Sequence, residues 1–180
     1  MRHVSIRDND RKWKKFFKEM NKLGQLEIRA GYPEGGADYG GGEDENGNKE
    51  PSLLEIVAWN EYGTYNIPPR PFLNETVDKQ GDVLRNAQQL YLKAVVEGKL
   101  TSKGALQKLG VNIVDAIRYT IRAGDFRANA PITIEGGWMR NKKSDKLFYV
   151  EGKHSSRPLI DSGRMRQTVN FVIKPKGGGD

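Results

Sequence analysis

Three prolines crowd into the four positions between residues 68 and 71, and no other feature constrains the fold of this 180-residue chain as strongly. Proline removes a backbone N–H donor and fixes φ, so this stretch can be neither a helix nor a central strand. We therefore interpret residues 65–72 as a rigid extended strap that holds Tyr65, Arg70 and Phe72 at set positions.

A helix is expected on each side of the strap. Before it, Ser52 and Glu55 have the spacing of a capping box, in which each side chain satisfies a backbone N–H at the helix start. This helix should span 53–62 and stop at Gly63, because glycine most easily adopts the left-handed conformation that ends a helix. After the strap, Asn74 is expected to cap a second helix.

The same stretch carries a family resemblance. Residues 60–64 (NEYGT) and 67–73 (IPPRPFL) resemble a signature of the neck and tail-completion, or virion-morphogenesis, proteins of long-tailed bacteriophages. That family has a second signature near its C-terminus, which residues 157–165 (RPLIDSGRM) resemble, with serine for threonine at 162 and methionine for leucine at 165. The signature residues with an expected structural role are Glu61, Gly63, Pro69, Pro71, Asp161 and Gly163.

The resemblance, which spans about residues 26–173, implies a function. It implies a structural protein of the head–tail connector, neck or upper tail that completes the tail and helps join it to the head. Its partners would be other copies of itself, in a ring around the DNA channel, and the neighbouring neck and tail proteins, with weak contact to channel DNA. It would be assembled in the host cytoplasm and stay in the virion, with no membrane partner.

Hydrophobic periodicity predicts an α+β fold. Helices are expected over 10–23, 53–62, 74–97 and 102–123, the last capped by Thr101 or Ser102. Alternating apolar and polar residues predict antiparallel strands near 26–32, 131–135 and 168–174, with 147–150 as a strand or an extended segment. We expect one small antiparallel β-sheet covered mainly on one face by helices, in a single domain of residues 1–180 with a flexible loop at 34–50 and a flexible tail at 176–180.

Two segments have more than one interpretation. The helix over 10–23 has an aromatic stripe and a lysine-rich remainder, which suits a membrane surface or a partner groove, but we expect it to pack on its own sheet. Residues 138–157 carry Trp138, Phe148 and Tyr149 among polar neighbours. We expect this arm to become ordered against a partner, the alternative being a hairpin that extends the sheet. The arm and the strap are then the two subunit or partner interfaces.

No enzyme is expected, and no catalytic, metal or cofactor-binding residue is predicted. The chain has no cysteine, its two histidines (His3 and His154) have no spaced partner, and the acidic residues at 43–45 do not match a calcium loop. The net charge of +7 supports an alternative function, a basic nucleic-acid-binding protein. A non-virion assembly factor is a further alternative. The candidate nucleic-acid residues are Lys12, Lys15, Arg140, Lys142, Lys143 and Lys146.

Overall fold

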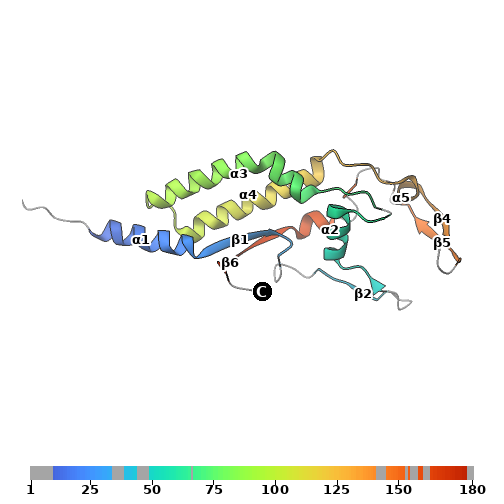
Figure 1. Cartoon of the computed structure of the whole chain (residues 1–180), viewed down its shortest axis with the longest axis horizontal. Coiled ribbons are helices and arrows are strands. Elements are labelled where there is room, and N and C mark those ends of the chain that lie inside the picture. The colour runs from blue at the N-terminus through green and yellow to red at the C-terminus, as the bar shows by residue number, and fades with distance from the viewer. Residues whose placement is uncertain are drawn as a thin grey trace, which may run out of the picture. The chain divides into compact units, whose positions relative to one another are not determined.

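A computed structural model describes residues 10–33, 39–43, 49–65, 67–140, 145–152, 154, 158–159 and 163–177. The elements of the described residues are α1 (Asp10–Gly24), β1 (Leu26–Gly31), β2 (Gly42–Glu43), β3 (Lys49–Glu50), α2 (Leu53–Tyr62), α3 (Phe72–Val96), α4 (Ser102–Ala123), α5 (Pro131–Glu135), β4 (Gly136–Arg140), β5 (Leu147–Glu151), α6 (Arg164–Thr168) and β6 (Asn170–Pro175) (Figure 1). The fold is α+β, as predicted.

The chain divides into two compact units that share the two long helices. One unit takes in Met1–Gly36, Lys79–Asp115 and Asn170–Asp180, and the other takes in Ala37–Asp78 and Ala116–Val169. The first unit therefore holds α1, β1, β6 and most of α3 and α4. The second holds α2, α5, α6, the hairpin β4–β5, the start of α3 and the end of α4.

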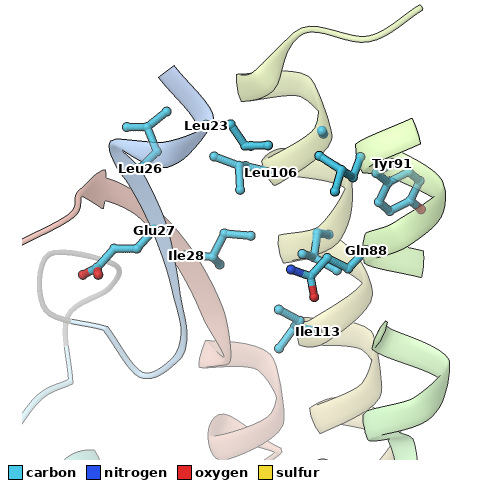
Figure 2. Close-up of a pocket in the computed structure, with 11 residues that line it drawn as sticks. Leu23, Leu26, Glu27, Ile28, Gln88, Tyr91, Leu106 and Ile113 are labelled. Atoms are coloured by element: carbon cyan, nitrogen blue, oxygen red, sulfur yellow. The ribbon is translucent and has the colours of Figure 1, made fainter. Parts of the chain in front are cut away.

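In the first unit, β1 and β6 pair antiparallel, with Leu26 opposite Pro175 and Gly31 opposite Asn170. This confirms the strands expected near 26–32 and 168–174. The helices α3 and α4 lie on the sheet face that carries Ile28 (Figure 2). Gly110 on α4 allows the close approach of β6, because a Cβ there would collide with the Phe171 ring. The turn between the helices uses Gly98, whose φ of 73° suits glycine.

The first helix does not pack on the sheet as expected. None of the residues of α1 is buried. The helix is attached near its C-terminal end, where the Glu19 carboxylate accepts hydrogen bonds from the Ser102 backbone N–H and hydroxyl (both 2.7 Å) at the start of α4. Thr101 caps α4 by accepting from the Gly104 N–H (3.1 Å), which confirms one of the two expected caps.

In the second unit, α2 begins with the predicted capping box. The Ser52 hydroxyl accepts from the Glu55 N–H (3.2 Å), and the Glu55 carboxylate accepts from the Ser52 N–H (2.8 Å). Within the expected loop at 34–50, the short strands β2 and β3 pair antiparallel. The buried apolar side chains of this unit are Leu53, Val57, Phe72, Ile117, Ile121, Met165 and Val169.

Two strand predictions need correction. Residues 131–135 form the short helix α5 rather than a strand. Five alternating residues are too few to distinguish the two periods, whereas Pro131 at the first helical position favours a helix start. The predicted strand at 147–150 exists as β5, but it pairs with β4 and not with the main sheet. The described strands thus form three separate two-stranded ladders instead of one sheet.

Candidate functional site

The first signature forms a tight corner between α2 and α3. Gly63 ends α2 with a φ of 77°, and a Cβ at this position would lie 2.9 Å from the Pro69 nitrogen. Thr64 and Ile67 close the loop, since the Thr64 N–H donates to the Ile67 carbonyl (2.8 Å) and the Ile67 N–H donates to the Thr64 hydroxyl (3.0 Å). Only glycine at 63 lets the chain fold back this closely. Pro69 and Pro71 are exposed on the strap.

Glu61 is the cap of α3. Its side chain is buried, and its two carboxylate oxygens accept from the backbone N–H groups of Leu73 (2.9 Å) and Asn74 (3.1 Å). These are two of the four N–H groups that a helix leaves without intrahelical partners at its start, and a negative charge there also suits the helix dipole. The expectation that Asn74 caps this helix is wrong, because Asn74 is already its third residue.

Arg70 is buried in the same corner. Its Nε donates to the Arg127 carbonyl (2.9 Å), and its Nη2 donates to the Ala128 carbonyl (3.4 Å) and to Asn129 Oδ1 (3.2 Å). Its Nη1 donates to Asn60 Oδ1 (3.2 Å), and its own N–H donates to the Asn60 carbonyl (2.6 Å). Burial lowers the pKa of Arg70, and the charge of Arg127 lowers it further, yet a guanidinium stays charged at neutral pH.

Two of the three strap residues are therefore not interface residues. Arg70 is occupied by contacts with 127–129 inside its own unit, and Phe72 has no exposed surface. The sequence pattern indicates a rigid strap but not the direction in which each side chain points. Tyr65 is 94% exposed and stays a candidate contact residue.

The arm predicted over 138–157 contains an ordered hairpin. In β4 and β5, Trp138 lies opposite Tyr149 and Met139 lies opposite Phe148. Successive residues of a strand point to opposite faces, so each face of the hairpin carries one of these pairs. The Trp138 and Tyr149 rings meet edge to face at 5.5 Å, and Trp138, Phe148 and Tyr149 are all exposed.

The base of the hairpin is closely packed and is joined to α5 by a backbone hydrogen bond. The His154 N–H donates to the Ile134 carbonyl (2.9 Å). A Cβ at Gly136 would lie 2.6 Å from the Gly152 nitrogen, and a Cβ at Gly137 would lie 2.8 Å from the Ile132 side chain. The base of the hairpin is thus held by main-chain groups and small residues, while its aromatic residues stay outside.

Within the second signature, residues 157–165, the structure describes residues 158–159 and 163–165. Asp161, which was expected to have a structural role, lies outside the described residues. Gly163 precedes α6 with a φ of 74°, and Met165 and Val169 are buried. Arg118 of α4 donates to the carbonyls at the end of α6, those of Arg166 (3.2 Å), Gln167 (3.4 Å) and Val169 (2.9 Å). No local pattern in the sequence marks this contact.

The candidate nucleic-acid residues that the structure describes are divided between the two units. Lys12 and Lys15 are exposed on α1, and Lys146 is exposed beside β5. Arg140 forms an ion pair with Asp145 (3.0 Å), which offsets its charge, and Lys142 and Lys143 lie outside the described residues. Among the residues that the structure describes there is no group of three or more acidic or histidine side chains able to hold a metal ion. His154 is exposed, and His3 is not described.

Comparisons with protein-family models, with curated proteins and with solved structures found no match for this chain. In the described part of the chain, no helix is both long and apolar enough to cross a membrane.

Proposed function

We propose that this chain is a structural subunit of a bacteriophage neck or upper tail, one copy in a ring around the DNA channel that completes the tail and joins it to the head. The identification with this class rests on the two sequence signatures at 60–73 and 157–165. The observation that carries the proposal of an assembly protein is the β4–β5 hairpin, with aromatic or apolar side chains on both faces.

The two strands of this hairpin are not expected to be stable without a further contact. Two strands without a third strand or a covering helix along them are marginally stable in water. Trp138 is 70% exposed and Phe148, on the other face, is 45% exposed, so neither face is a closed core. Aromatic residues grouped on an exposed element are typical of protein contacts, where they act as anchors. A neighbouring subunit or tail protein that covers both faces would stabilise the hairpin.

The signature residues support the same function in a different way. Glu61, Gly63 and Arg70 are used inside the subunit to hold the corner between α2 and α3, so they shape the scaffold and perform no chemistry. This arrangement suits a protein that functions through contacts of its surface with other proteins.

Complementation of a phage in which this gene is deleted tests the proposal. We expect the deletion to yield unjoined heads and tails, and we expect the wild-type chain to restore joined particles and to be detected in them by mass spectrometry. Trp138→Ala together with Tyr149→Ala should give a folded protein that fails to restore them. Asp78→Ala, exposed on α3 and outside the hairpin, is the control and should restore them.

The alternatives predict other results. A non-virion assembly factor restores infectivity but is missing from mature particles. A nucleic-acid-binding protein binds DNA at low salt, and its affinity falls steeply as salt is added because counterions are released. Such binding, lost on replacement of Lys12, Lys15 and Lys146 and unaffected by Trp138→Ala, would replace the proposed function.

A further inference from the structure

The aromatic side chains of α1 form an exposed cluster. Trp13, Phe16 and Phe17 pack against one another with ring centroids 5.4–6.1 Å apart, and we call them the aromatic knob. Trp13 is 61% exposed and Phe17 is 58% exposed. The helix buries none of its residues, so these three aromatic rings are not covered by the rest of the subunit. An exposed group of this kind is typical of a surface that contacts another molecule.

The same unit contains an apolar pocket of about 380 Å³ between β1, α3, α4 and the end of α1 (Figure 2). Ile28 of β1 and Ile113 of α4 point toward each other across it, and Leu23 and Leu106 line the end nearest α1. The carboxylate of Glu27 points away from it. This volume lies at the lower end of the roughly 300–1,000 Å³ range of protein binding pockets, and the lining suits an apolar ligand.

The knob of a subunit cannot enter the pocket of that subunit. Leu23 already lines the pocket, and Trp13, Phe16 and Phe17 lie six to ten residues earlier on the same uninterrupted helix, about 9–15 Å away along its axis at 1.5 Å per residue. Any aromatic knob that occupies the pocket must come from another molecule.

We propose that the aromatic knob of one copy of this chain inserts into the apolar pocket of a second copy, head to tail. Two different patches on each subunit form such a heterologous contact, which closes into a ring when the rotation between neighbours permits. The charges are compatible with insertion, because Arg11, Lys15, Lys18 and Lys22 lie on the face of α1 opposite the knob at 100° per residue and stay in water. The proposed ring needs a heterologous contact between neighbouring subunits, and this one would supply it. The inference rests on the proposed function in that sense, but the contact can be tested without a phage.

The area of the contact indicates its strength. Aromatic side chains bury about 150–250 Å² each, so the exposed parts of Trp13 and Phe17 supply about 250 Å², and with the pocket lining about 500 Å² in total. A stable pair of proteins buries at least about 1,200 Å². One contact is therefore too small for a stable dimer, and the association should be weak until each subunit makes two contacts in a closed ring.

Cysteine cross-linking between two different molecules tests the contact, since the native chain has no cysteine. Met20→Cys places a thiol on the knob face one turn after Phe16, and Gln88→Cys places one at the edge of the pocket. Mixing the two single-cysteine proteins, one with a larger tag, should give a mixed disulfide. Gln89→Cys, exposed on α3 but not lining the pocket, is the matched control and should give about tenfold less.

Sedimentation over a concentration series supplies a second measurement. Trp13→Ala should weaken self-association about 30-fold, since truncating an anchoring aromatic costs about 2 kcal/mol. Lys15→Ala with Lys18→Ala, on the opposite face, should not weaken it. Equal cross-linking to positions 88 and 89, or self-association unchanged by Trp13→Ala, would overturn the proposal. If the mixed disulfide forms but the protein is absent from virions, only the proposed phage function is wrong. If the protein is present in virions but the mixed disulfide does not form, only this inference is wrong.

Discussion

Replacement of Glu61 should destabilise the subunit through the start of α3. In Glu61→Ala the N–H groups of Leu73 and Asn74 both lose their acceptor. Leu73 is half-buried, so leaving its N–H without an acceptor costs about 1–3 kcal/mol of stability. Asn74 is exposed, so water can replace the carboxylate as the acceptor of its N–H. Loss of the negative charge near the helix N-terminus adds about 0.3–1 kcal/mol.

The sum is about 1.3–4 kcal/mol, which corresponds to a decrease in Tm of about 3–16 °C for a protein of this size. Glu61→Gln keeps one acceptor oxygen and turns an NH2 toward the other donor, so it should lose about half as much. Asp78→Ala, exposed two turns into α3, is the control and should change stability by less than about 0.5 kcal/mol.

Differential scanning calorimetry measures the three Tm values, and hydrogen exchange locates the change. The amides of residues 73 and 74 should lose protection in Glu61→Ala but keep it in Asp78→Ala. A Tm of Glu61→Ala equal to that of the control would show that the helix start is satisfied in another way, and the capping explanation would then be wrong.

Three further predictions concern other residues of the two units. Arg70→Lys should cost about 2–3 kcal/mol, because an ammonium cannot reach all the carbonyls that the guanidinium binds, and hydrogen exchange at 127–129 should increase. Gly63→Ala should cost more than Gly98→Ala in chemical denaturation, since both have a positive φ but only the Cβ at 63 meets backbone atoms. Hydrogen bonds from the start of α4 lower the pKa of Glu19, so its carboxylate should stabilise the fold at neutral pH and lose that effect as pH falls below about 4.5; the stability difference from Glu19→Gln should close over that range.

The sequence allowed prediction of those elements whose signals are local. The capping box at Ser52 and Glu55 and the long apolar periodicities gave the helices α2, α3 and α4 within two residues. The strands β1 and β6 were recognised by their alternation, although they lie at opposite ends of the chain. The prediction at 131–135 failed because five residues contain too little periodicity, and there the helix-starting proline decided the structure.

The candidate site was less predictable, because its contacts join residues distant in sequence. Three of the side-chain partners of Arg70 lie 57–59 residues further along the chain, and no spacing rule connects them with it. The aromatic stripe of α1 predicts a buried face but not which molecule buries it. A pattern of apolar residues reports only that water is excluded, and it gives the same signal for an intramolecular core and for a subunit contact.

The burial of Glu61 and Arg70 changes how variants of the signature should be interpreted. The N–H groups of Leu73 and Asn74 at the start of α3 lack intrahelical partners, and Glu61 satisfies them, while Arg70 satisfies the carbonyls of residues 127 and 128. Leaving such a buried group unsatisfied costs more than the net gain from one hydrogen bond. A substitution at either residue would therefore disturb the fold of the second unit before it touched any interface. An assembly defect in such a variant would be evidence about folding. Only substitutions of residues that are exposed in the single subunit, such as Tyr65, Trp138 and Tyr149, can show that an assembly defect comes from a lost contact and not from a lost fold.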